Sequence, residues 1–231
     1  MDGPISDLEK GMMCRIAGYA ELRTAVADAV DSRIGNPETW LDTGCGTGGS
    51  IRLSVERHPE THFTLADPSE ENLAKAEESV GASGSIAAPT HLIDLPDGSF
   101  DVITSILSNH YYSDRGEKRK AVSNCHRMLR DGGVLVIVEH TVHPENQDSC
   151  DREWAAYMRG KGLPEDRIAE MFERRNTVYF PMTEDDLKAL ILSCGFSEAE
   201  VFWRSCSDVG IVAVKRSPSH SGNRIIPKIF L

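Results

Sequence analysis

The segment Trp40-Leu41-Asp42-Thr43-Gly44-Cys45-Gly46-Thr47-Gly48-Gly49 joins a short apolar run to a glycine-rich turn, and a helical pattern follows from Ser50 to Arg57. Glycine is favoured where a backbone turns sharply and a ligand approaches it closely, because no Cβ blocks either event. A strand, a glycine turn and a helix in this order predict an α/β sheet with a ligand site beyond the end of its first strand.

Asp42 separates the ligands that such a turn can bind. Gly44, Gly46 and Gly49 also satisfy the dinucleotide fingerprint, but a pyrophosphate needs helix N-terminal amides and no nearby anion. A carboxylate two residues before the first glycine suits a cation instead. S-adenosylmethionine, which carries a sulfonium and an ammonium group and no phosphate, is therefore favoured as the cofactor over a nicotinamide or a flavin.

Composition narrows the class of protein. A chain of 231 residues with 40% hydrophobic and 26% charged residues is typical of one globular domain, which we predict over residues 1–216. The formal net charge of −11 argues against nucleic-acid and anionic-membrane partners, since both require basic surface. Six dispersed cysteines without a C-x-x-C pair, together with a polar amino terminus, favour a cytoplasmic location.

Strand-like runs alternate with helical stretches through the first two thirds of the chain, as in parallel β-α-β units. Two final strands, Ala199–Cys206 and Val209–Lys215, are joined by so short a link that they must form an antiparallel hairpin. The earlier strands are expected at Thr39–Asp42, His62–Asp67, Ser85–Thr90, Phe100–Leu107 and Gly133–Thr141, with a helix over Glu117–Arg130.

Polar, helical sequence interrupts this alternation at about residues 144–182, where we expect a helical cap over the sheet edge. Thr183, followed by three acids, predicts the N-cap of a further helix that ends near Gly195. Residues 217–231 are expected to form a flexible tail. An apolar face on the cap would suit a homodimer.

The whole pattern resembles the class I S-adenosylmethionine-dependent methyltransferases: an Asp-x-Gly-x-Gly-x-Gly turn, a mostly parallel seven-stranded Rossmann-like sheet and an antiparallel last hairpin. Asp67, the lead-in Pro96–Asp101 and the segment Leu129–Gly133 are similar to further motifs of that family. Met12–Tyr19 and Phe202–Cys206 are similar to the carboxy-S-adenosylmethionine synthase subgroup and its methyltransferase relatives, and Ser105–Tyr111 is similar to those relatives.

The resemblance implies a set of cofactor-binding residues. Gly44, Cys45 and Gly46 would present amides to the methionine carboxylate, Asp42 would face the ammonium group directly or through water, and Asp67 would hold the ribose. Arg15 and Tyr19 would close over the methionyl end, while Thr90 and His91 would lie beside the adenine. The remaining residues expected along the cofactor are Pro68, Ile106 and Ser108.

His110 lies at the carboxyl end of a predicted strand, and ligands of open α/β sheets bind beyond such ends. It is therefore the best placed general base, although a role as a hydrogen-bonded wall residue is equally open. Tyr111, Trp154, Arg174 and Arg175 are the candidate substrate-binding residues. His140 and His143 would point to opposite faces of a strand, so no metal site is predicted.

We therefore predict transfer of a methyl group to a small-molecule acceptor. Three alternatives remain open at this point: a carboxy-S-adenosylmethionine synthase, in which Arg174 or Arg175 would hold the extra carboxylate; a cofactor-binding module without catalytic activity; and a nicotinamide-dependent oxidoreductase.

Overall fold

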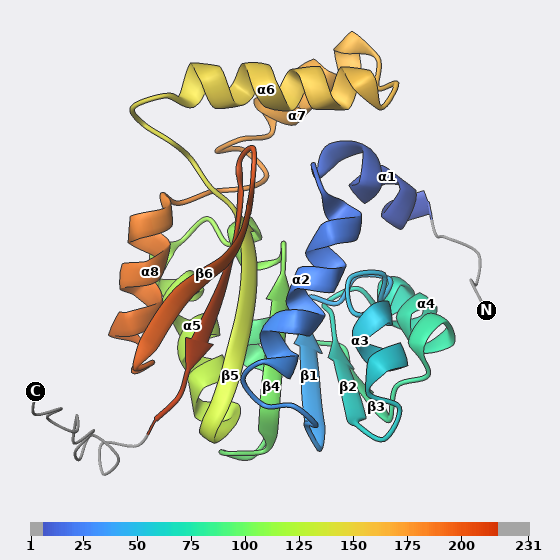
Figure 1. Cartoon of the computed structure of the whole chain (residues 1–231), viewed down its shortest axis with the longest axis vertical. Helices are drawn as coiled ribbons and strands as arrows, with labels where there is room; N and C mark the ends of the chain where they lie inside the picture. The colour runs from blue at the N-terminus through green and yellow to red at the C-terminus, as the bar shows by residue number, and fades with distance from the viewer. Residues whose placement is uncertain (1–6, 217–231) are drawn as a thin grey trace, which may run out of the picture.

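The computed structural model describes residues 7–216, with side chains from Glu9 onward. A sheet of seven strands in the order β3-β2-β1-β4-β5-β7-β6 forms its centre (Figure 1). Neighbouring strands are parallel, except that β7 is antiparallel to both β5 and β6. The predicted fold, a mostly parallel α/β sheet with an antiparallel last hairpin, is confirmed. The strands are β1 (Thr39–Thr43), β2 (His62–Ala66), β3 (Gly84–Ile86), β4 (Phe100–Ile106), β5 (Leu129–His140), β6 (Glu198–Ser205) and β7 (Asp208–Val214).

Helices cover both faces of the sheet, because successive strand residues point to opposite sides. Trp40 packs with α2 (Tyr19–Asp31) and α4 (Glu70–Val80), whereas its neighbour Leu41 packs with α5 (Arg115–Met128) and α8 (Glu184–Ser193). The same alternation divides Val134, Val136 and Val138 from Leu135 and Ile137 on β5. The short helix α3 (Arg52–Arg57) follows the glycine turn.

Three helices lie beyond the carboxyl edge of the parallel strands (Figure 1). Cap helices α6 (Gln147–Gly160) and α7 (Glu165–Glu173) share an apolar cluster that includes Trp154, Met158 and Ile168. Trp154 donates its indole N–H to the Arg15 carbonyl at 2.6 Å, and the Tyr157 hydroxyl lies 2.8 Å from the Met13 carbonyl. The cap is therefore joined to the carboxyl end of α1 (Asp7–Arg15), a helix that the sequence pattern did not predict.

Several predicted boundaries are wrong for identifiable reasons. β3 ends at Ile86 rather than Thr90, because Pro89 lacks an amide donor and residues Thr90–Leu92 form the 3-10 turn η1. α5 begins at Arg115, since Asp114 accepts the Glu117 amide as its N-cap. β5, expected from Gly133, starts at Leu129 and includes Gly132 in the left-handed region.

The division into one domain over residues 1–216 stays a prediction. The tail expected over residues 217–231 lies outside the described residues. Between residues 7 and 216, every helix is too short or too polar to cross a membrane.

Candidate functional site

The glycine turn after β1 passes between the ends of the two neighbouring strands. Gly44, Gly46 and Gly48 all have left-handed backbone angles, with φ between 53° and 80°. The amides of Gly44 and Cys45 donate to the Ala66 carbonyl on β2 at 2.7 and 3.0 Å. On the other side, a Cβ added to Gly44 would overlap the Ser108 side chain, with its Oγ only 2.7 Å away. Close packing, as well as the turn itself, therefore requires glycine at position 44.

Asp67 holds the turn from the end of β2. Its Oδ2 accepts the Gly46 amide at 2.9 Å, and its Oδ1 accepts the Ser69 amide at 2.9 Å at the start of α4. The amides of Gly44, Cys45 and Gly46 thus already have acceptors within the protein. The prediction that these three amides bind a ligand carboxylate is not what the structure shows, and the residues contribute wall surface instead.

Asp42 is buried beneath the turn, with 1% of its surface exposed. Thr104 donates its hydroxyl to Oδ1 at 2.6 Å, while Oδ2 is buried and has no hydrogen-bond partner within the described residues. Burial raises the pKa of Asp42 to about 7; the Thr104 hydrogen bond opposes this shift, and the Asp67 charge adds to it. Asp42 does not line the cavity, so of its two predicted modes of contact with a ligand, directly or through water, direct contact is not what the structure shows.

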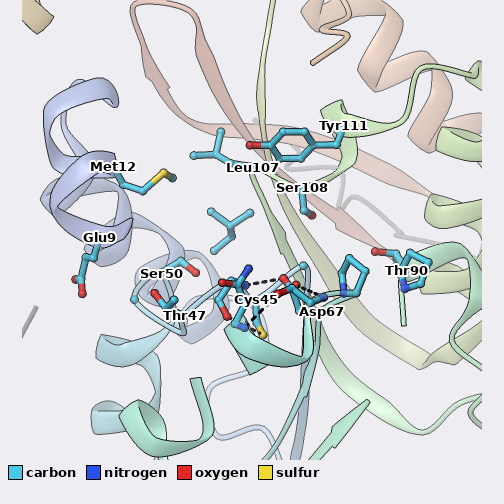
Figure 2. A pocket seen from close by; sticks show the side chains of 18 of the residues that line it. Glu9, Met12, Cys45, Thr47, Ser50, Asp67, Thr90, Leu107, Ser108 and Tyr111 are labelled. Atoms are coloured by element: carbon cyan, nitrogen blue, oxygen red, sulfur yellow. Dashed lines mark hydrogen bonds between the residues drawn. The ribbon is translucent and has the colours of Figure 1, made fainter. Parts of the chain in front are cut away.

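A cavity of about 420 Å³ opens above the turn (Figure 2). Tyr19 begins α2 and closes one side, where the Arg23 guanidinium lies 5.7 Å from the centre of its ring. Leu107 leaves β4 with a left-handed φ of 54°, and Ser108, Tyr111 and Tyr112 of the following turn line the cavity. The predicted site residues that line it are Tyr19, Gly44, Cys45, Gly46, Asp67, Pro68, Thr90, Ile106, Ser108 and Tyr111.

Glu9 and Met12 on α1 also line the cavity, and the sequence analysis missed both as site residues. Glu9 is buried and forms ion pairs with Arg23 at 2.9 Å and with Arg52 at 3.3 Å. These partners come from α2 and α3, so no local pattern around Glu9 could have revealed its position.

Comparisons with known proteins agree with this geometry. The family described as methyltransferase domain matches residues 41–137, which contain the glycine turn, Asp67 and β4. Demethylmenaquinone methyltransferase from Thermotoga maritima is 36% identical over 45% of this chain and 44% of its own length. A carboxy-S-adenosyl-L-methionine synthase from Shewanella amazonensis is 22% identical over 87% of this chain and 85% of its own length. The chain thus spans less than half of the first relative and most of the second.

Solved structures share the whole fold at low identity. The sugar N-methyltransferase KedS8 from a Streptoalloteichus species has a TM-score of 0.64 and 19% identity, over 94% of this chain and 95% of that one. Human N-acetylserotonin methyltransferase in complex with SAM has a TM-score of 0.60 and 14% identity, over 87% of this chain and 52% of that one.

Residues 41–137 match the methyltransferase domain family. The resemblance read from its sequence is thereby confirmed at the level of the family.

His110 of the methyltransferase domain does not line the cavity. It is 3% exposed, with Nδ1 lying 3.0 Å from Glu139 Oε2 and its ring 4.7 Å from that of His140. Burial lowers the pKa of His110, and the nearby Glu139 carboxylate opposes this effect. In this position His110 supports the turn that carries Tyr111, so the geometry favours a structural role behind the cavity over the role of general base.

The cap residues predicted to bind substrate lie elsewhere as well. Trp154 is 2% exposed and belongs to the cap's own apolar cluster. Arg175 forms two hydrogen bonds with the Asp151 carboxylate, at 2.9 and 2.6 Å, so its guanidinium is already paired. Neither Arg174 nor any other described residue of the cap lines the cavity.

Two other predicted cofactor residues are also displaced from the cavity. Arg15 donates its Nε to the Gly11 carbonyl at 2.9 Å, and His91 packs edge-on against Tyr112 with ring centres 5.1 Å apart. His140 is paired with Asp208. Between residues 9 and 216, no three His, Cys, Asp or Glu side chains gather in a group suited to a metal ion.

Gly44 in the turn and Gly81 at the end of α4 offer a matched pair of glycine substitutions. Gly44 and Gly81 have nearly the same φ, 69° and 66°, but nothing lies within 4 Å of a Cβ added to Gly81. We expect Gly81→Ala to cost about 1 kcal/mol of unfolding free energy from backbone strain alone. Gly44→Ala should cost about 2 kcal/mol more, because it also clashes with Ser108. Urea unfolding measures both.

Combining Gly44→Ala with Ser108→Gly removes the opposing side chain and should recover most of this additional loss. Equal destabilisation by Gly44→Ala and Gly81→Ala would contradict the steric explanation.

Proposed function

We propose that this protein transfers a methyl group from S-adenosylmethionine to a small-molecule acceptor in the cavity above β1. The observation that carries the proposal is the buried Asp42 carboxylate, whose Oδ2 has no hydrogen-bond partner in the described part of the chain. A buried carboxylate without a full set of partners is costly. A cationic ligand above the turn offsets that cost, whereas a pyrophosphate would increase it.

Asp67 and the residues around it fit the rest of such a cofactor. Each Asp67 oxygen accepts one amide and has a further lone pair, so the carboxylate retains capacity for the two ribose hydroxyls. Pro89 and Thr90 line the same side of the cavity and offer mainly apolar and backbone surface to an adenine. When bound, the cofactor supplies a methyl group activated by its cationic sulfur. The protein contributes orientation and exclusion of water.

Binding of the product S-adenosylhomocysteine tests the proposal directly. Calorimetry should detect binding to the unmodified protein, and Asp67→Asn should weaken it at least about tenfold, because a charged acceptor is lost. Asp97→Asn is the surface control, since Asp97 is exposed, pairs with Arg127 and lies outside the cavity lining. Absence of binding to the unmodified, folded protein would refute the proposed function.

Asp42 predicts how this affinity depends on pH. A pKa of about 7 means that Asp42 is mostly protonated below pH 7 and must lose its proton to face a cation. The Kd for S-adenosylhomocysteine, which carries an ammonium group, should therefore rise up to tenfold for each pH unit below about 7 and level off above it. Asp42→Asn should bind weakly with no such pH dependence.

The stability of the ligand-free protein should show the opposite trend. The folded-state pKa of Asp42 lies above its ordinary value of 3.8, so its stabilising contribution is complete below pH 4 and is lost as pH rises through about 7. Thermal unfolding of the unmodified protein and of Asp42→Asn across this range measures the difference.

For the binding measurement, a Kd for S-adenosylhomocysteine that stays constant from pH 5.5 to 8 would contradict the assignment of Asp42.

Carboxy-S-adenosylmethionine synthesis is the second candidate, favoured by the match to a synthase over most of both chains. The cavity argues against it, because Arg175 is paired with Asp151 and Arg174 does not line the wall. An additional carboxylate would have no cationic partner there. Mass spectrometry of ligand released from the purified protein should show the ordinary cofactor or its product, whereas a carboxylated cofactor would reverse the ranking of the two candidates.

A further inference from the structure

The cavity has two chemically different parts. The glycine turn and Asp67 form its polar floor, and Met12, Leu107 and Tyr111 stand opposite them (Figure 2). If the floor holds the cofactor as proposed above, the apolar part is where the acceptor must lie. Its side chains therefore report what kind of acceptor the site can accept.

Charge restricts the acceptor first. Among residues 9–216, no Lys, Arg or His lines the cavity, and the only charged residues that do so are Glu9 and Asp67. Asp67 accepts two backbone amides, and Glu9 is paired with Arg23 and Arg52. A carboxylate or phosphate on the acceptor would lose its water in this cavity and gain no cation in return, which is strongly unfavourable.

The kind of nucleophile that can react depends on whether the cavity lining contains a group that can accept its proton. His91 and His110 are next in sequence to wall residues, but neither lines the cavity, and His110 is buried and faces Glu139 behind the turn. Asp67 accepts the Gly46 and Ser69 amides, and its remaining lone pairs are assigned above to the ribose hydroxyls of the cofactor. With no free base in the lining, the reacting group must lose its proton readily by itself. Phenols and thiols do so at moderately alkaline or neutral pH, whereas aliphatic alcohols do not.

Tyr111 indicates the shape of the acceptor. Its side chain is 54% exposed although it lies at the cavity, and it is among the most exposed large apolar residues of the described chain. The ring of His110 supports it from one side, with ring centres 4.5 Å apart. An aromatic ring fixed from behind and open in front is a stacking surface for a second flat ring.

We propose that the acceptor is an uncharged aromatic phenol or thiol that stacks on Tyr111, a proposal that rests on the methyltransferase function proposed above. Tyr111 is then the residue that determines acceptor specificity. The acceptor releases its proton to solvent, and its oxygen or sulfur lone pair forms the new bond to the methyl carbon. The electron pair of the broken carbon–sulfur bond remains on the cofactor sulfur, which becomes a neutral thioether.

Two phenols that differ only in their para substituent test the charge argument. The protein loaded with S-adenosylhomocysteine is titrated with p-cresol and with 4-hydroxybenzoate, and the Kd of each is measured by ligand-detected NMR. We expect p-cresol to bind at least about tenfold more tightly, because only 4-hydroxybenzoate carries a carboxylate into the cavity. Equal affinity, tighter binding of 4-hydroxybenzoate, or binding of neither phenol would overturn the inference.

Variants of Tyr111 test the stacking argument. Tyr111→Ala should weaken p-cresol binding about tenfold, and Tyr111→Phe, which keeps the ring, should restore most of it. Leu192→Ala, at an exposed position on α8 outside the cavity lining, is the control. Unchanged p-cresol binding in Tyr111→Ala would also overturn the inference.

Calorimetry with S-adenosylhomocysteine on the same samples separates the two proposals. If this ligand does not bind to the unmodified protein, the methyltransferase proposal fails. If it binds normally but the phenol preference or the Tyr111 effect is missing, only the acceptor inference fails.

Discussion

The whole site depends on the close approach of three strand ends around Gly44. The Gly44 amide is held by the Ala66 carbonyl at 2.7 Å, and the space where its Cβ would lie is filled by Ser108. Because β2, β1 and β4 are neighbours in the sheet, their carboxyl ends must converge here. A side chain at position 44 would separate β4 from β1 and displace the residues that enclose the cavity. The turn therefore fixes the floor of the cavity and one of its walls together.

Burial of the Asp42 carboxylate adds an unfavourable electrostatic free energy to folding, and the packing of the sheet does not require it. Asp42 is almost completely buried on a central strand, with one oxygen lacking a hydrogen bond among the described residues and a second carboxylate, Asp67, close enough to raise its pKa. An apolar residue at this position would stabilise the sheet. Local rules of stability are commonly broken where a ligand compensates for the loss, which is the role proposed above for the cationic cofactor.

The sequence predicted those parts of the structure that local chemistry determines. Alternation of apolar residues and the short link before Val209 were sufficient for the sheet and its last hairpin, and Asp42, Gly44 and Asp67 were sufficient to locate the cavity. Long-range pairing was not predictable in the same way. The sequence predicted that Arg175 binds a substrate, but its guanidinium is paired with Asp151, 24 positions earlier in the chain. His110 follows the correct strand, but its side chain is directed by Glu139 on β5.

The same limitation explains why Glu9 and Met12 were missed and how the cap influences the site. No described residue of α6 or α7 lines the cavity, but Trp154 and Tyr157 hydrogen-bond to carbonyls at the end of α1. Helix α1 in turn brings Glu9 and Met12 to the wall, where Arg23 and Arg52 hold Glu9 from α2 and α3. The cap thus contributes to the cavity by positioning α1 and not by direct contact. Changes in the cap should consequently alter the apolar wall while leaving Asp67 and the glycine turn in place.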